Sequence, residues 1–133
     1  MKRTFLDTVG LLAVWNKSDQ WHSAAVDAMK SLIDQNVDCY CSDSIFLECG
    51  NAAARTSVRD EVVRFRSLTV TSDLLLTPTD EELELAWSSY SSRSGAGAGI
   101  VDQISFVLMN RMEITEVFSN DEHFRAAGFI TLF

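Results

Sequence analysis

Hydrophobic side chains recur every three or four residues along much of the chain, the spacing of helices that bury one face. The pattern is clearest over residues 21–33, where apolar positions form one stripe and charged residues lie between them. A capping box, formed by Thr79 and Glu82, opens a later helix whose inward stripe is predicted to be Leu83, Ala86, Trp87 and Tyr90. The expected helices cover residues 9–15, 21–33, 43–57, 58–67, 80–90, 100–110 and 122–127.

Short β-compatible runs separate these helices, and the third run is closed by Pro78, the only proline. Strands that alternate with helices predict an α/β fold of three layers, with helices on both faces of a mainly parallel sheet of four to five strands. The chain has 133 residues, of which 47% are hydrophobic, so we expect a single domain over 1–133. The expected strands cover residues 3–6, 37–41, 74–77, 116–119 and 129–132.

The segment 100–110 is apolar on nearly all sides, which predicts a helix buried in the centre of the domain. Asp102 lies at its start, and no basic residue follows one helical turn later; the nearest cation forward is Arg111. A buried carboxylate destabilises a fold by several kcal/mol unless it is paired, hydrogen-bonded or bound to a metal. Asp102 is therefore a candidate metal ligand.

Three further acids are expected near Asp102. Asp7 ends the first strand, Asp121 follows the fourth, and Glu48 lies about one turn into the helix after the second strand. Ligands of open α/β sheets bind beyond the carboxyl ends of the strands, so the four side chains can converge on one rim. Carboxylate oxygens are the ligands that Mg²⁺ prefers, and this convergence without compensating bases favours a metal site.

Charge and composition narrow the function classes. The net charge of −8 argues against nonspecific binding to nucleic acid, although a bound cation reverses the local field of an acidic site. The three cysteines, Cys39, Cys41 and Cys49, fit neither a disulfide framework nor a zinc site and are expected to be free thiols. No apolar stretch is long enough to span a bilayer and no cleavage site follows the first residues, so we expect a cytoplasmic protein without membrane association.

Several segments, taken in order, resemble the PIN-domain family, and in particular VapC-type toxins of toxin–antitoxin pairs. The run FLDT resembles the family's first strand and acid, SIFLECGNAAAR the helix that carries its glutamate, and VDQISF the helix of its third acid. The most specific match is FSNDEHFRAAGF, which resembles the turn that brings the fourth acid, while WHSAAV, with His22, is similar to the second helix. The loop before Asp102 departs from the family pattern, because it is unusually rich in glycine and alanine.

The resemblance implies a Mg²⁺- or Mn²⁺-dependent endoribonuclease in which Asp7, Glu48, Asp102 and Asp121 bind the metal and carry the catalysis. Ser119 is expected to hydrogen-bond a metal-bound water or a carboxylate, and Arg55 to contact phosphate or to pair with a neighbouring acid. The resemblance also implies an RNA substrate, a homodimer and a VapB-type antitoxin. Exposed apolar residues, among them Phe46, Leu47 and Phe65, are candidates for a partner surface.

Other candidate features favour structural interpretations. His22 and His123 each lie beside an aromatic residue in a predicted helix, which favours packing or surface placement over a general-base role. The GAGAG run matches neither the dinucleotide fingerprint nor the P-loop pattern. The acids of residues 80–84 are typical of a solvated first helical turn, where negative charge interacts favourably with the helix dipole.

Two rival functions remain open at this stage. Phosphatase-like phosphoryl-transfer domains also place an acid after the first strand, but Asp7 is followed by Thr8 and Val9, without a second aspartate two residues on. A non-catalytic PIN-like binding module would have the same fold without metal binding, and retention of all four acids argues against it.

Overall fold

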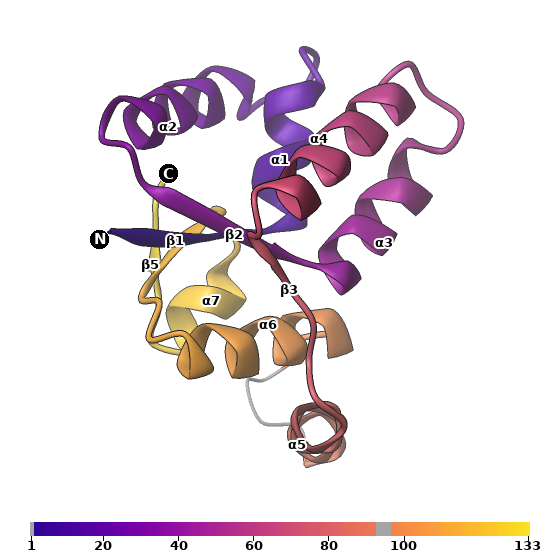
Figure 1. Cartoon of the computed structure of the whole chain (residues 1–133), viewed down its shortest axis with the longest axis vertical. Coiled ribbons are helices and arrows are strands. Elements are labelled where there is room, and N and C mark those ends of the chain that lie inside the picture. The colour runs from indigo at the N-terminus through magenta and orange to yellow at the C-terminus, as the bar shows by residue number, and fades with distance from the viewer. Residues whose placement is uncertain (1, 93–96) are drawn as a thin grey trace.

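A five-stranded parallel sheet divides the molecule into two helical layers, as the computed structural model of residues 2–92 and 97–133 shows (Figure 1). The strand order is β3-β2-β1-β4-β5, with the chain's first strand at the centre. The strands are β1 (Arg3–Leu6), β2 (Asp38–Ser42), β3 (Leu75–Leu76), β4 (Glu116–Phe118) and β5 (Ile130–Thr131). The α/β class and the parallel sheet expected from the sequence are confirmed.

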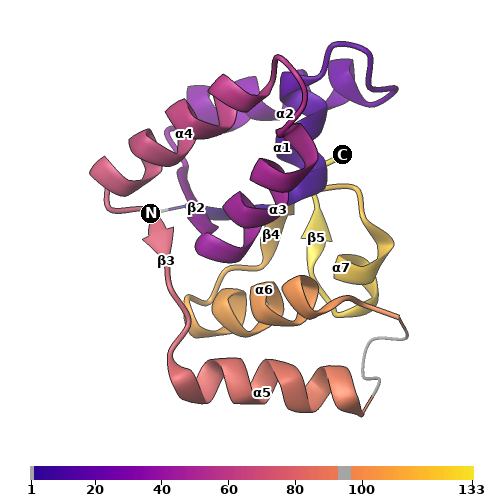
Figure 2. The same cartoon turned by 90° about the vertical axis from the view of Figure 1, so that its right-hand side faces the viewer.

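Seven helices are described, and they cover both faces of the sheet. Helices α1 (Thr8–Trp15), α2 (His22–Asp34), α3 (Asp43–Ala53) and α4 (Arg59–Thr71) lie on one side, and α5 (Asp80–Ser91), α6 (Ile100–Arg111) and α7 (Glu122–Ala126) lie on the other (Figures 1 and 2). Helix α6 packs on the sheet and α5 lies outside α6 (Figure 2). None of the described helices is long and apolar enough to cross a membrane.

The hydrophobic core lies between the sheet and its helical layers. Phe5, Leu6, Val117 and Phe118 of the two central strands are fully buried, as continuous apolar runs in a two-sided parallel sheet require. Helix α6 buries six of its twelve residues, which confirms the central, buried helix expected over 100–110.

Two helix boundaries differ from the sequence expectation. The helix expected to reach residue 57 ends at Ala53, because Thr56 forms competing local hydrogen bonds: its hydroxyl donates to the Ala53 carbonyl (2.9 Å) and accepts from the Val58 amide (3.2 Å). The next helix continues to Thr71, four residues beyond the expected end.

Some burial expectations were wrong. Trp87 and Tyr90 are about half exposed, because α5 is an outer helix that buries only Ala86 completely. Phe46 is buried rather than exposed, and Phe65 packs edge-on against Trp15. Leu47 is 70% exposed, as expected for a surface position. The GAGAG motif lies partly outside the described residues.

Candidate metal centre

Asp7 is the most buried acid of the site. It follows β1 and caps α1, where its Oδ2 atom accepts hydrogen bonds from the Val9 amide (3.4 Å) and from the Ser119 hydroxyl (2.8 Å). Only 3% of the residue is exposed, and this burial raises the pKa of Asp7 to about 7. The Ser119 hydrogen bond lowers the pKa and the negative charge of Asp102 raises it.

A close approach between α1 and β4 positions Ser119 beside Asp7. A Cβ atom added at Gly10 would clash with the carbonyl oxygen and ring of Phe118, so the contact requires a residue without a side chain. Ser119 is fully buried, and its hydroxyl also accepts from the Asp121 amide (3.1 Å). The expected hydrogen bond from Ser119 to a carboxylate is therefore present, and it connects two of the predicted acids.

Glu48 reaches the site from the opposite wall. Its helix, α3, begins after β2 with Ser42 as the cap, whose Oγ accepts from the Ile45 amide (3.3 Å). The Thr8 hydroxyl donates to Oε1 of Glu48 (2.6 Å), which orients the carboxylate toward the start of α1. No hydrogen bond within the described residues engages Oε2 of Glu48.

Asp102 is the third residue of α6. Its Oδ2 atom accepts from the Gly99 amide (3.3 Å) and lies 3.6 Å from Nδ1 of His123. Burial is the main cause that raises the pKa of Asp102, and the charge of Asp121 raises it further, whereas the Gly99 hydrogen bond and His123 lower it. The structure thus gives Asp102 the partly buried, acidic surroundings that the sequence suggested.

Asp121 caps the short helix α7, and its Oδ1 atom accepts from the His123 amide (2.9 Å). The His123 ring folds back over the cap, with Nδ1 3.1 Å from the same Oδ1. One ligand atom from each of Asp102, Asp121 and His123 lies within 4.8 Å of the others, a spacing at which three groups can share a cation.

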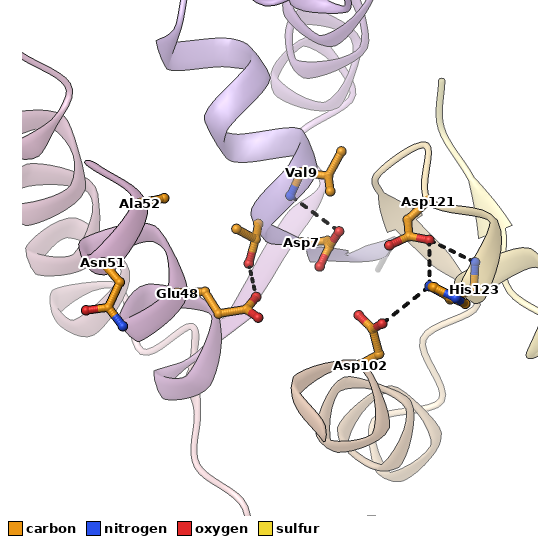
Figure 3. A pocket seen from close by; sticks show the side chains of 9 residues that line it. Asp7, Val9, Glu48, Asn51, Ala52, Asp102, Asp121 and His123 are labelled. Atoms are coloured by element: carbon orange, nitrogen blue, oxygen red, sulfur yellow. Dashed lines mark hydrogen bonds and ion pairs between the residues drawn. The ribbon is translucent and has the colours of Figure 1, made fainter. Parts of the chain in front are cut away.

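The four predicted acids line one open cleft of about 690 Å³. Figure 3 shows Asp7 in the middle, Glu48 on one side, and Asp102, Asp121 and His123 on the other. Asp7 and Glu48 stand outside the closest group of Asp102, Asp121 and His123. Among the described residues, no lysine or arginine lines the cleft.

The donor set fits a hard divalent cation. Carboxylate oxygens dominate it, one imidazole is within reach, and the charge repulsion that raises the pKa of Asp102 is the repulsion that a cation relieves. Mg²⁺ and Mn²⁺ both accept oxygen ligands of this kind. The metal-site hypothesis from the sequence is therefore consistent with the geometry.

His123 lines the cleft, although the sequence pattern favoured packing or surface placement for it over a role in the site. Its side chain is partly exposed, but it lies in the cleft between two acids rather than packing elsewhere. Its position two residues after Asp121 was the available signal, because a side chain in the first turn after a cap remains close to the cap. His22, in contrast, bonds the Ala13 carbonyl through Nδ1 (2.8 Å), which confirms its structural placement.

Arg55 does not lie where the sequence expectation placed it. Because α3 ends at Ala53, Arg55 is in the following turn instead of one helix face with Glu48, and it is exposed and outside the cleft. The described residues form no ion pair with it, so the alternative of a salt bridge to a neighbouring acid is not observed either.

Comparison with solved structures identifies the architecture. VapC20 of Mycobacterium tuberculosis, described as a sarcin-ricin loop-cleaving toxin, is similar with a TM-score of 0.77 and 23% identity over 96% of both chains. The fold is PIN-like. A chain of FitAB bound to a DNA fragment matches this PIN-like fold with a TM-score of 0.71 and 17% identity, over 96% of this chain and 92% of the other.

FitAcB from Neisseria gonorrhoeae has the same PIN-like fold, with a TM-score of 0.65 and 20% identity over 96% of this chain and 95% of the other. The resemblance to PIN-domain toxins that the sequence motifs carry is thereby confirmed at the level of the fold. No family model matches the sequence, and no curated protein matches it significantly.

Proposed function

We propose that this protein is a divalent-metal-dependent endoribonuclease, the toxin of a toxin–antitoxin pair. The observation that carries the proposal is the cleft where Asp7, Glu48, Asp102 and Asp121, from four separate elements, converge without a lysine or arginine among the described lining residues. The PIN-like fold supports it, since one structure with this fold is described as a toxin that cleaves the sarcin-ricin loop.

The four acids act as ligands of Mg²⁺ or Mn²⁺, directly or through water, and His123 joins them next to Asp102 and Asp121. A divalent cation held by these residues would supply Lewis acidity toward a phosphodiester and would lower the pKa of a bound water. Thr8 holds Glu48 through one oxygen and leaves the other available, while Ser119 and the Val9 amide hold Oδ2 of Asp7. These bonds fix the carboxylates before metal arrives.

The partners follow from the same proposal. An RNA strand is the substrate, and a VapB-type antitoxin with a cationic segment complements the acidic cleft. FitAB and FitAcB, whose chains share the fold, support a protein partner of this kind. We also propose a homodimer and action in the cytoplasm.

Cleavage of total RNA by the purified protein tests the proposal, with Mg²⁺, with Mn²⁺ and with EDTA. The Asp7→Ala variant is compared with Asp27→Asn, which neutralises an exposed carboxylate of α2. We expect metal-dependent cleavage by the wild type and by Asp27→Asn, and none by Asp7→Ala. Equal cleavage in EDTA, or by Asp7→Ala, would refute the assignment; metal binding without any cleavage would favour a non-catalytic PIN-like module.

A further inference from the structure

A second hollow adjoins the acidic cleft. Its volume is about 290 Å³, and it lies between the end of α1 and the turn that joins α3 to α4. Ala52 lines both the hollow and the cleft, so the two adjoin along α3. In Figure 3, Asn51 and Ala52 lie on the far side of Glu48 from the three aspartates. A chain bound at the acids can therefore extend over Ala52 into the hollow.

The lining of the hollow suits a planar, partly polar group. Leu12, Ala53 and Val58 supply an apolar surface, and Asn16, Asp19 and Ser57 contribute polar groups. Three side-chain polar atoms have no hydrogen bond within the described residues: Nδ2 of Asn16, Oδ2 of Asp19 and the hydroxyl of Ser57. The other oxygen of Asp19 is engaged by the Trp21 amide (2.8 Å), and the Asn16 oxygen by the Ser18 amide (3.1 Å).

The charge distribution excludes a phosphate inside the hollow and allows one beside it. The carboxylate of Asp19 repels phosphate, but it accepts hydrogen bonds from the amino group of a base, as acidic side chains do with cytosine. Arg55 lies in the turn between α3 and α4, and Arg59 is the first residue of α4. Neither is ion-paired within the described residues. Arg59 is held by a hydrogen bond to the Ala54 carbonyl (3.2 Å).

We propose that this hollow is a nucleobase subsite, which binds an unpaired, amino-bearing base of the RNA next to the scissile phosphate. The inference rests on the proposed ribonuclease function. Asp19 accepts from the exocyclic amino group, Asn16 and Ser57 donate to the ring, and Arg55 and Arg59 contact the backbone outside. Proteins that recognise RNA sequence-specifically most often bind unstacked bases of single-stranded segments. Uracil, which lacks an amino group, binds least well.

The test uses single-stranded hexauridylate RNAs in which one position at a time carries adenine, cytosine or guanine. Cleavage is measured in Mn²⁺, and binding of the same RNAs is measured by fluorescence anisotropy in Ca²⁺. For the wild type we expect an amino-bearing base at one position to raise the cleavage rate and the binding affinity by about tenfold or more over uracil at that position. Asp19→Asn keeps the oxygen that accepts from the Trp21 amide but loses the carboxylate, so the preference for an amino-bearing base should fall to near unity. Ser57→Trp fills the hollow and should also abolish this preference.

Matched controls separate a site effect from a general one. Asp27→Asn and Ser67→Trp make the same chemical changes at exposed positions of α2 and α4, and both should retain the full preference. A preference that survives in folded Asp19→Asn and Ser57→Trp, or a wild type that does not distinguish uracil, would overturn the subsite. Base-dependent binding without cleavage would support the subsite and refute the nuclease function. Cleavage without base dependence would support the nuclease function and refute the subsite.

Discussion

Glu82 and Asp102 occupy the same position in two helices that pack against each other. Each is the third residue of its helix, and each accepts a hydrogen bond from the backbone amide of the preceding cap: Thr79 to Oε1 of Glu82 (2.9 Å) and Gly99 to Oδ2 of Asp102 (3.3 Å). Their side chains are similarly shielded, with 15% and 20% exposed. The local structure alone does not distinguish them.

Their surroundings differ in charge. The second oxygen of Glu82 lies 3.0 Å from Nε of Arg111, so its charge is compensated. Asp102 is near Asp121 and Glu48, which both raise its pKa, and among the described residues that line the cleft the one nitrogen base beside it is His123, at 3.6 Å. The same capping acid is therefore structural where a guanidinium is available and a metal-ligand candidate where other acids gather. The difference between Glu82 and Asp102 therefore comes from the residues that surround each side chain in the fold, and not from their position at the start of a helix.

Neutralising Asp102 and Glu82 in turn should give the clearest distinction between a metal ligand and a structural capping acid. We expect Asp102→Asn to lower the rate of RNA cleavage by on the order of a hundredfold or more, the scale of removing one electrostatic group from an active site, and Glu82→Gln to leave the rate unchanged. Asp102→Asn should fold normally or be slightly stabilised, because it removes repulsion with Asp121. Cleavage assays with circular dichroism measure both effects; full activity of Asp102→Asn would contradict the site.

Asp7 should make the stability of the metal-free protein depend on pH. Its pKa is about 7 in the fold and 3.8 as a model value, so the folded state holds the proton more strongly. The free energy of unfolding should then fall by a few kcal/mol as pH rises from about 4 to 7, at about 1.4 kcal/mol per pKa unit. Asp7→Asn, whose amide oxygen can accept both bonds now made to Oδ2, should remove this fall; urea denaturation in EDTA at several pH values measures it.

Ser119→Ala should have an intermediate effect. It removes the hydroxyl that stabilises the charged form of Asp7, so we expect a loss of about 1–3 kcal/mol in unfolding free energy, larger at pH 8 than at pH 4. Ser105→Ala is the matched control, because that buried hydroxyl donates to the Val101 carbonyl and forms no hydrogen bond to an acid of the site within the described residues. The same pH dependence in both variants would refute the role given to Ser119.

The smallest effect is expected at the compensated acid. Glu82→Gln retains an oxygen for the Thr79 amide and loses only the charge interaction with a partly exposed Arg111, so the unfolding free energy should change by about 1 kcal/mol or less. Thermal denaturation of the wild type and Glu82→Gln at the same pH measures this change in stability. A loss of several kcal/mol would show that the ion pair is more than a surface contact.

The alternation of predicted strands and helices along the chain indicated the element order and the parallel sheet, which the structure confirms. Asp7 and Asp121 were identified because each follows a predicted strand, and ligands of open α/β sheets bind beyond the carboxyl ends of the strands. Two features were not visible in this pattern. Local hydrogen bonds of Thr56 accompany the early end of α3, so that Arg55 lies in the following turn and outside the cleft. The packing between helices places α5 outside α6, which leaves Trp87 half exposed. Spacing along the chain indicates that His123 lies near Asp121, but its approach to Asp102 depends on how α7 meets α6, which the spacing does not encode.

Binding of Mn²⁺, followed by isothermal titration calorimetry on the wild type, Asp102→Asn and Glu82→Gln, tests the central claim that the acidic cleft is a metal centre. We predict saturable binding by the wild type and by Glu82→Gln, and binding that is lost or strongly weakened in Asp102→Asn. Undiminished binding by Asp102→Asn, or no binding by the wild type, would contradict the claim.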